Sequence, residues 1–138
     1  MITYALDTNT LSYFLRDEGN VRKNMEQEIF RSGNAYAIPP ITIYEVQRWL
    51  RDKPTQNMKI ASQQFETLLY AVKGKSEISL DIWEKAADIY ISLKQKGQLI
   101  GDADILIAAY CLINNYTLVT HNTNDFVRIE RLKIVSWY

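Results

Sequence analysis

Aspartates beside apolar segments are the residues of this sequence whose types and spacing could do chemistry. Asp7 directly follows a short apolar run, and Asp125 comes shortly after another. Asp102 and Asp104 open a segment whose apolar residues recur at helical spacing. No lysine or arginine is interleaved with these acids locally. If the apolar runs are neighbouring parallel strands, their carboxyl ends share one edge of a sheet, and the carboxylates are expected to converge there.

Converging carboxylates favour a bound cation. Like charges repel one another, so one carboxyl of the group should take up a proton unless a cation is present. Ligands that are all oxygens favour a hard ion, Mg²⁺ or Mn²⁺, over zinc, which prefers histidine and cysteine. Mg²⁺ held by few carboxylates keeps positions open for water and for phosphate oxygens. The reaction that fits such a site is hydrolysis of a phosphodiester.

The pattern of apolar residues predicts strands that alternate with helices. The first run is expected to form a buried strand, central in a parallel sheet, with a helix beginning at Asp7. Strands are predicted at about 2–6, 35–38, 77–80, 116–120 and 133–137, and helices at about 7–19, 20–32, 43–50, 57–72, 81–96 and 102–114. Thr42 and Asp81 are expected to cap two of these helices. The alternation is typical of an α/β fold with a mostly parallel sheet and right-handed crossovers.

The composition is that of an ordinary globular protein. The 138 residues, 47% hydrophobic and 23% charged, are expected to form a single domain over residues 1–138. Sixteen basic residues balance sixteen acidic ones, so the net charge gives no sign of nonspecific nucleic-acid coating. No apolar run is long enough for a membrane helix, and the start of the sequence does not resemble a signal peptide. With a single cysteine, Cys111, these features favour a cytoplasmic protein that makes no contact with a membrane.

Four motifs occur in order along the chain. They are Leu6-Asp7-Thr8-Asn9, Ile43-Tyr44-Glu45-Val46, the segment 100–109 (Ile-Gly-Asp-Ala-Asp-Ile-Leu-Ile-Ala-Ala) and the segment 118–126 (Leu-Val-Thr-His-Asn-Thr-Asn-Asp-Phe). In this order they resemble the VapC branch of the PIN-domain family, and the match runs from residue 2 to about residue 137. The resemblance implies a PIN-like three-layer α/β/α domain.

Carried onto this sequence, the resemblance implies that four acids bind the metal and act in catalysis: Asp7, Glu45, Asp104 and Asp125. Spacing alone would have left Glu45 on a helix surface. Residues that could hold water or orient these carboxylates are Thr8, Asn9, Asp102, Thr120 and Asn122. Turn chemistry explains the threonines and asparagines equally well, and for Asp102 a helix N-cap is the preferred role. His121 stands where the family often has asparagine or arginine, and we do not favour it as a general base.

The resemblance further implies an endoribonuclease that acts on structured RNA and leaves 5′-phosphate and 3′-hydroxyl ends. Such a protein is the toxin of a toxin–antitoxin pair. Its expected partners are a VapB-type antitoxin that inserts into the active-site groove, a second copy in a homodimer, and operator DNA only through the antitoxin. The motifs are most similar to those of family members that cut initiator tRNA, so tRNA is the favoured substrate and ribosomal RNA the alternative. Basic side chains that could contact phosphates at the rim, or simply be solvated, are Arg48, Arg51, Lys53, Lys94 and Lys96.

Three other functions fit parts of the pattern. An aspartyl-phosphate phosphatase or phosphoacceptor also places an acid after the first strand, but the second acid it needs is replaced here by Asn9, and no lysine obviously serves the phosphate. A PIN-fold binding module without turnover is disfavoured by the complete acidic quartet. An RNA-processing nuclease that is not a toxin keeps the same chemistry. An upstream reading frame for a short antitoxin would distinguish a toxin from a processing enzyme.

Overall fold

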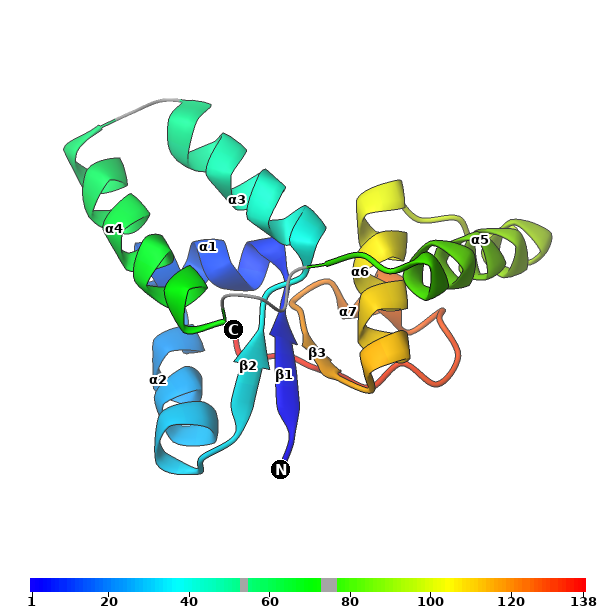
Figure 1. Cartoon of the computed structure of the whole chain (residues 1–138), viewed down its shortest axis with the longest axis horizontal. Coiled ribbons are helices and arrows are strands. Elements are labelled where there is room, and N and C mark those ends of the chain that lie inside the picture. The colour runs from blue at the N-terminus through cyan, green and yellow to red at the C-terminus, as the bar shows by residue number, and fades with distance from the viewer. Residues whose placement is uncertain (53–54, 73–76) are drawn as a thin grey trace.

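The computed structural model describes residues 1–52, 55–72 and 77–138, and a parallel four-stranded sheet lies at its centre (Figure 1). The strands are β1 (Thr3–Leu6), β2 (Ala35–Ala37), β3 (Thr117–Val119) and β4 (Ile134–Val135), and their order across the sheet is β2-β1-β3-β4. Leu6 pairs with Val119 and Ala5 with Ala37. β1 is therefore an inner strand, as predicted, and the carboxyl ends of all four strands share one edge.

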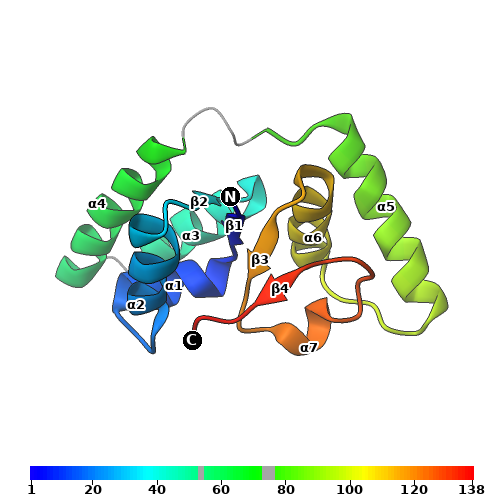
Figure 2. The ribbon, with the colours of Figure 1, turned by 90° about the horizontal axis from the view of Figure 1, so that it is seen from below.

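Helices cover both faces of the sheet. They are α1 (Thr8–Arg16), α2 (Val21–Met25), the π-helical turn η1 (Glu26–Arg31), α3 (Pro40–Asp52), α4 (Gln56–Ala71), α5 (Leu80–Gln95), α6 (Asp102–Asn114) and α7 (Thr123–Phe126). α1, α2 and α4 lie on one side of the sheet, and α6 and α5 on the other (Figure 2). The three-layer α/β/α arrangement that the family resemblance implied is confirmed. None of the helices within the described residues is long and apolar enough to span a bilayer.

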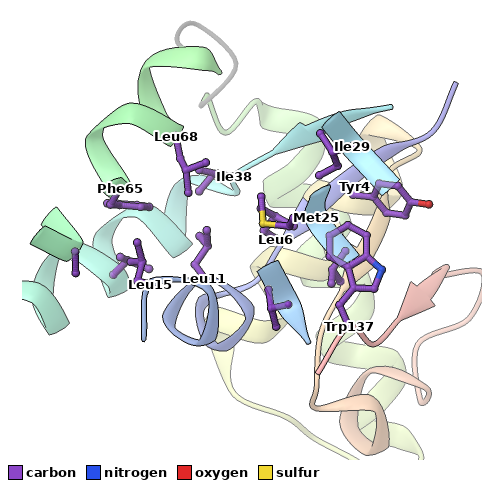
Figure 3. Packing of buried hydrophobic residues seen from close by; sticks show 14 of the residues in the cluster. Tyr4, Leu6, Leu11, Leu15, Met25, Ile29, Ile38, Phe65, Leu68 and Trp137 are labelled. Atoms are coloured by element: carbon purple, nitrogen blue, oxygen red, sulfur yellow. The ribbon is translucent and has the colours of Figure 1, made fainter. Parts of the chain in front are cut away.

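Alternation along the strands builds a core on each face. Tyr4 and Leu6 of β1 belong to the cluster that includes buried residues of α1, α2 and α4, drawn in Figure 3. Ala5, between them, belongs to the second cluster, with α5 and α6. β3 divides in the same way, since Val119 joins the first cluster and Leu118 the second. Because successive side chains point to opposite faces, a strand buried on both sides is apolar throughout.

Three local predictions are wrong. Residues 77–79 form no strand, and Leu80 begins α5. Ile78 packs against the second core cluster without strand pairing, which explains the apolar character of this segment. Asp81 lies in the first turn of α5, and Ser79 takes the N-cap position. Thr42 does not cap α3, because the helix begins at Pro40 and the Thr42 amide already donates to the Pro39 carbonyl at 2.9 Å. Proline suits that first position because its missing N–H would have had no helical partner.

Some features were not predicted or cannot be compared. The short helix α7 and the π-helical geometry of η1 had no recognised signal in the sequence. Lys53, one of the basic side chains expected at the rim, lies outside the described residues.

Candidate active site

Asp7 lies at the carboxyl end of β1, where α1 begins. Its backbone N–H donates to the Val119 carbonyl at 3.2 Å, so the ladder between β1 and β3 extends to this residue. Its Oδ1 accepts the Thr10 N–H at 2.8 Å, which makes Asp7 the N-cap of α1. The residue is only 5% exposed. The sheet and the helix cap together fix this carboxylate at the edge where parallel sheets bind ligands.

Thr120 holds Asp7 from the neighbouring strand. It directly follows β3 and is completely buried. Its hydroxyl forms a hydrogen bond with the Asp7 carboxylate and accepts the Asn122 N–H at 3.0 Å. The Thr10 hydroxyl donates to the Val119 carbonyl at 2.9 Å. These contacts tie the end of β3 to the start of α1.

Glu45 comes to the same edge from α3. This helix begins three residues after β2 ends, so its first turns lie above the carboxyl ends of the strands. The Thr8 hydroxyl donates to Glu45 Oε1 at 2.6 Å, and the Glu45 residue is half-buried. The helical spacing of α3 alone does not predict this position, because the contact depends on how α3 packs on α1.

Asp104 lies in the first turn of α6 and is half-buried. Burial, followed by the negative charges of Asp7, Glu45 and Asp125 in that order, raises its pKa to about 6. Burial also raises the pKa of Asp7, against the lowering effect of its hydrogen bonds with Thr120 and Thr10, and the charge of Glu45 adds to the rise. Three other acids therefore act on Asp104, which shows that the structure brings the predicted quartet into one electrostatic neighbourhood.

Within the described part of the chain, Asp125 is the acid of the quartet that has a basic partner. It lies on α7, where Asn122 Nδ2 donates to its Oδ2 at 3.0 Å. Arg128 forms an ion pair with its Oδ1 at 3.5 Å. Sequence reasoning overlooked Arg128. The spacing of three residues between Asp125 and Arg128 would have indicated this pair if the short helix had been recognised.

Three further residues that the sequence analysis considered, two of them as site residues, form no hydrogen bond or ion pair with the quartet within the residues that the structure describes. Asp102 is exposed at the first position of α6, and Gly101 occupies the N-cap, so the capping role expected for Asp102 is wrong. Its carboxylate still lies where the helix dipole favours negative charge. Asn9 is exposed, and among the described residues no hydrogen bond joins its side chain to an acid of the quartet. His121 is exposed and contacts the rings of Tyr13 and Tyr138.

The donor set suits a hard divalent ion that retains water. All four groups are carboxylates, and two of them, Asp7 and Asp104, have raised pKa values that a nearby cation would lower. In their present positions, no three Asp, Glu, His or Cys side chains in the described ranges are drawn together tightly enough to hold a metal ion. Thr8, Thr10 and Asn122 occupy some of the oxygens instead. Mg²⁺ fits such a site because it keeps several waters and needs only one or two direct carboxylates.

A groove with basic side chains continues from this site. Thr8, Asn9, Ser12 and Arg16 of α1 line one side, and Glu45, Arg48, Trp49 and Asp52 of α3 line the other. The Arg48 guanidinium lies over the Tyr44 ring, 5.2 Å from its centroid. Lys94 and Lys96, also expected at the rim, lie on or next to α5, where Lys94 contacts the Tyr90 ring and Lys96 pairs with Glu130 at 3.4 Å.

Comparison with known protein families identifies the domain that contains this site. The sequence model of the PIN domain matches residues 4–132. The chain belongs to the PIN-domain family. Ribonuclease VapC2 of Rickettsia felis is 30% identical to this PIN domain over 97% of each chain. Ribonuclease VapC1 of Methanocaldococcus jannaschii is 36% identical over 68% of this chain and 64% of its own length. Within the family the chain is of the VapC type, as its four motifs indicated.

Solved structures show the same fold. The crystal structure of VapBC2 from Rickettsia felis, bound to a DNA fragment from the promoter, contains a chain that is 27% identical. The two match with a TM-score of 0.81 over 99% of this PIN domain and 100% of that chain. A chain in VapBC-1 from nontypeable Haemophilus influenzae is 26% identical, with a TM-score of 0.80 over 99% of this PIN domain and 98% of that chain.

Proposed function

We propose that this PIN domain is a metal-dependent endoribonuclease and the toxin of a toxin–antitoxin pair. The observation that carries the proposal is the gathering, at one sheet edge, of acids from four separate segments: the end of β1, α3, α6 and α7. A group of neighbouring carboxylates, one buried and three half-buried, is costly unless it binds a cation or serves catalysis. That the relatives are named as ribonucleases supports RNA as the substrate.

Asp7, Glu45, Asp104 and Asp125 would hold Mg²⁺, for which Mn²⁺ can substitute. When bound, the ion orients a water for in-line attack on the phosphodiester and offsets the negative charge that develops on the phosphate. The protein's own part is to hold the carboxylates in place. Thr120 and the Thr10 amide fix Asp7, the Thr8 hydroxyl fixes Glu45, and Asn122 orients Asp125. Polar partners of this kind set the orientation and basicity of metal ligands.

The groove supplies contacts for the RNA backbone. Arg16 and Arg48 lie on its two walls, and Glu45 lines the same groove. Each guanidinium can donate two parallel hydrogen bonds to a phosphate. The formal net charge of zero is then explained by position, with acids at the centre of the site and bases along its rim. We propose structured RNA as the substrate and favour tRNA over ribosomal RNA, on the resemblance of the motifs around Asp7 and Asp125.

The solved relatives suggest the partners. Both structures are VapBC complexes, and one of them is bound to promoter DNA. We propose that this chain pairs with a VapB-type antitoxin whose tail enters the groove beside Glu45, and that it forms a homodimer. Operator DNA would be contacted only through the antitoxin. Because an inserted tail and the RNA would use the same groove, antitoxin binding would block cleavage directly.

A cleavage assay tests the nuclease proposal. Purified protein is incubated with total tRNA in Mg²⁺, in Mn²⁺ and in a chelator, and the new RNA 5′ ends are sequenced. We expect specific cuts in either metal and none in the chelator. Asp7→Asn should lose cleavage, whereas the exposed Asp102→Asn on α6 should keep it. Cleavage at the wild-type rate by Asp7→Asn would contradict the assignment. Absence of Mn²⁺ binding by calorimetry, together with no cleavage, would instead indicate a binding module.

A growth experiment separates a toxin from an RNA-processing enzyme. Induction of the wild-type chain should arrest growth, and induction of Asp7→Asn should not. Co-expression of a short protein encoded immediately upstream should relieve the arrest if that protein is the antitoxin. Normal growth while the RNA is cleaved would favour a processing role and leave the chemistry intact.

A further inference from the structure

Three rings that the site does not use form a cluster beside it. The centroids of His121 and Tyr138 are 4.5 Å apart, and their planes are tilted by 33°. The Tyr13 ring meets Tyr138 edge-on at 4.7 Å and His121 edge-on at 6.0 Å. We call Tyr13, His121 and Tyr138 the ring cluster. These side chains come from α1, from the segment after β3 and from the segment after β4, so only the folded chain brings them together.

The ring cluster is supported on one side and open on the other. A Cβ added at Gly19 would lie 3.2 Å from the Tyr138 ring, so the ring packs closely on backbone that only a glycine leaves accessible. Gly19 also has a φ of +61°, which disfavours other residues. Tyr138 is nevertheless 50% exposed, and His121 is exposed as well. The rings are thus held in place while part of their surface faces solvent.

The ring cluster lies next to the acids. His121 follows Thr120, whose hydroxyl binds Asp7, and consecutive Cα atoms are about 3.8 Å apart. Tyr13 lies on α1, the helix that Asp7 caps. The Arg16 guanidinium lies 5.6 Å from the centroid of the Tyr13 ring and also lines the groove that contains Glu45. The rings and the groove therefore both adjoin α1, the helix that Asp7 caps.

We propose that the ring cluster stacks a base of the RNA strand beside the cut phosphodiester. The inference rests on the proposed nuclease function and deepens it. Proteins that recognise RNA commonly stack unpaired bases on aromatic side chains or histidine, and each such contact strengthens binding without requiring one particular base. The arginines of the groove bind phosphates and are indifferent to sequence. The ring cluster thus selects cut sites where a neighbouring base can leave its stack.

Fluorescence of a base analogue tests the stacking directly. The probe is a single-stranded RNA octamer with one 2-aminopurine, whose emission falls when the base stacks. It is titrated in Ca²⁺ with Asp7→Asn protein, so that cleavage does not interfere. We expect quenching on binding, and about tenfold weaker binding with loss of quenching in Tyr138→Ala or His121→Ala.

Two further variants are controls for this assay. Tyr138→Phe keeps a ring and should keep the quenching. Tyr70→Ala, which removes a 78% exposed tyrosine on α4, is the matched control and should change neither readout.

Sequencing of RNA 5′ ends separates failure of this inference from failure of the nuclease proposal. With otherwise wild-type protein, Tyr138→Ala and His121→Ala should cut fewer sites or shift the base preference beside the cut, and Tyr138→Phe should not. Unchanged sites and rates in both alanine variants would overturn the stacking role while the nuclease function stands. If both variants cut normally but bind a co-expressed antitoxin more weakly, the cluster serves a protein partner and the inference is wrong. If the wild-type protein cuts no RNA, the nuclease proposal itself fails.

Discussion

Asp7 and Asp104 differ from Glu45 and Asp125 in how the fold treats their charge. Asp7 is buried at a strand end, and Asp104 is half-buried in the first turn of α6. Over the described ranges, neither forms an ion pair with a basic side chain, and burial raises the pKa of each. Glu45 and Asp125 are half-buried on other helices, where Thr8 donates to one and Asn122 and Arg128 donate to the other.

This difference suggests that the two pairs of acids contribute differently to metal binding. The first pair carries charge that the protein itself does not neutralise, so this pair depends most on a bound cation. Asp7 also has donors, in Thr10 and Thr120, but they do not offset the effect of its burial. The second pair is less buried than Asp7, and protein donors set its orientation before any ion arrives. We therefore expect Asp7 and Asp104 to contribute mainly affinity for the metal and Glu45 and Asp125 mainly its position. Variants of each pair and of its polar partners test this difference.

The largest effect is expected for the first pair. Asp7→Asn and Asp104→Asn keep the size of the side chain but remove the charge that attracts the ion. Loss of a metal's charge stabilisation costs several kcal/mol, so cleavage should fall by about a thousandfold or more. The measurement is kcat/KM on a cleaved RNA at several Mg²⁺ concentrations, together with Mn²⁺ affinity by calorimetry. A variant that binds Mn²⁺ as tightly as the wild type would contradict the proposal that Asp7 and Asp104 provide most of the metal affinity.

A smaller effect is expected when a partner of the second pair is removed. Thr8→Val deletes the hydroxyl that donates to Glu45 at 2.6 Å and keeps the branched shape. Loss of such a partner lowers metal affinity or activity by about 10- to 100-fold. Thr8→Ser keeps the hydroxyl and should restore most of the rate, which is the matched control. If Thr8→Val is as inactive as Asp7→Asn, Glu45 belongs with the first pair.

The sequence predicted the inner strands and the position of Asp7 well, because local patterns determine them. The apolar run before Asp7 indicated a buried strand, and the polar residues after it indicated a helix start. Both features depend on neighbours within a few residues. The position of Asp125 followed from one further rule, that parallel strands end at one edge. Asp104 comes after α5 rather than after a strand, and the family resemblance was what assigned it to the site.

Other parts of the site could not be read from local pattern. Glu45 reaches the edge because α3 packs on α1, a contact between segments 37 residues apart, and only the family resemblance indicated it. The capping errors at Thr42 and Asp81 arose because α3 starts two residues before Thr42 and α5 starts one residue before Asp81. The ring cluster went unnoticed because Tyr13, His121 and Tyr138 share no spacing that a sequence pattern can express.

The stability of the metal-free protein should depend on pH through ionisation of Asp104. The pKa of Asp104 is raised in the folded state, so ionisation of this carboxyl opposes folding. The destabilisation is absent below about pH 4, develops as the pH rises through about 6, and is complete above that value. Asp104→Asn should therefore raise the free energy of unfolding by about 1 to 2 kcal/mol at pH 8, after allowance for solvent screening, and by little at pH 4.

Urea denaturation in a chelator at the two pH values measures this change. Asp102→Asn is the control, because Asp102 is an exposed acid on the same helix and its loss should give no gain at either pH. Mg²⁺ should stabilise the wild type and leave Asp104→Asn unaffected, since only the protein with the full acidic set binds the ion. An equal gain at pH 4 and pH 8 would mean that packing, rather than charge, accounts for the effect.

The smallest effect is expected for Arg128. Its ion pair with Asp125 spans 3.5 Å, and both side chains are about one-third exposed. Such pairs contribute less than about 1 kcal/mol, because water and salt screen them. Asn122 also donates to Asp125 and would hold it after Arg128→Gln. The variant should therefore cleave RNA within about threefold of the wild-type rate.

Asn122→Ala in the Arg128→Gln background removes both donors to Asp125. The combined loss of cleavage rate should exceed the product of the two single effects, because each donor compensates for loss of the other. Simple multiplication of the two single effects would show that Asp125 is placed by α7 itself and not by its polar partners.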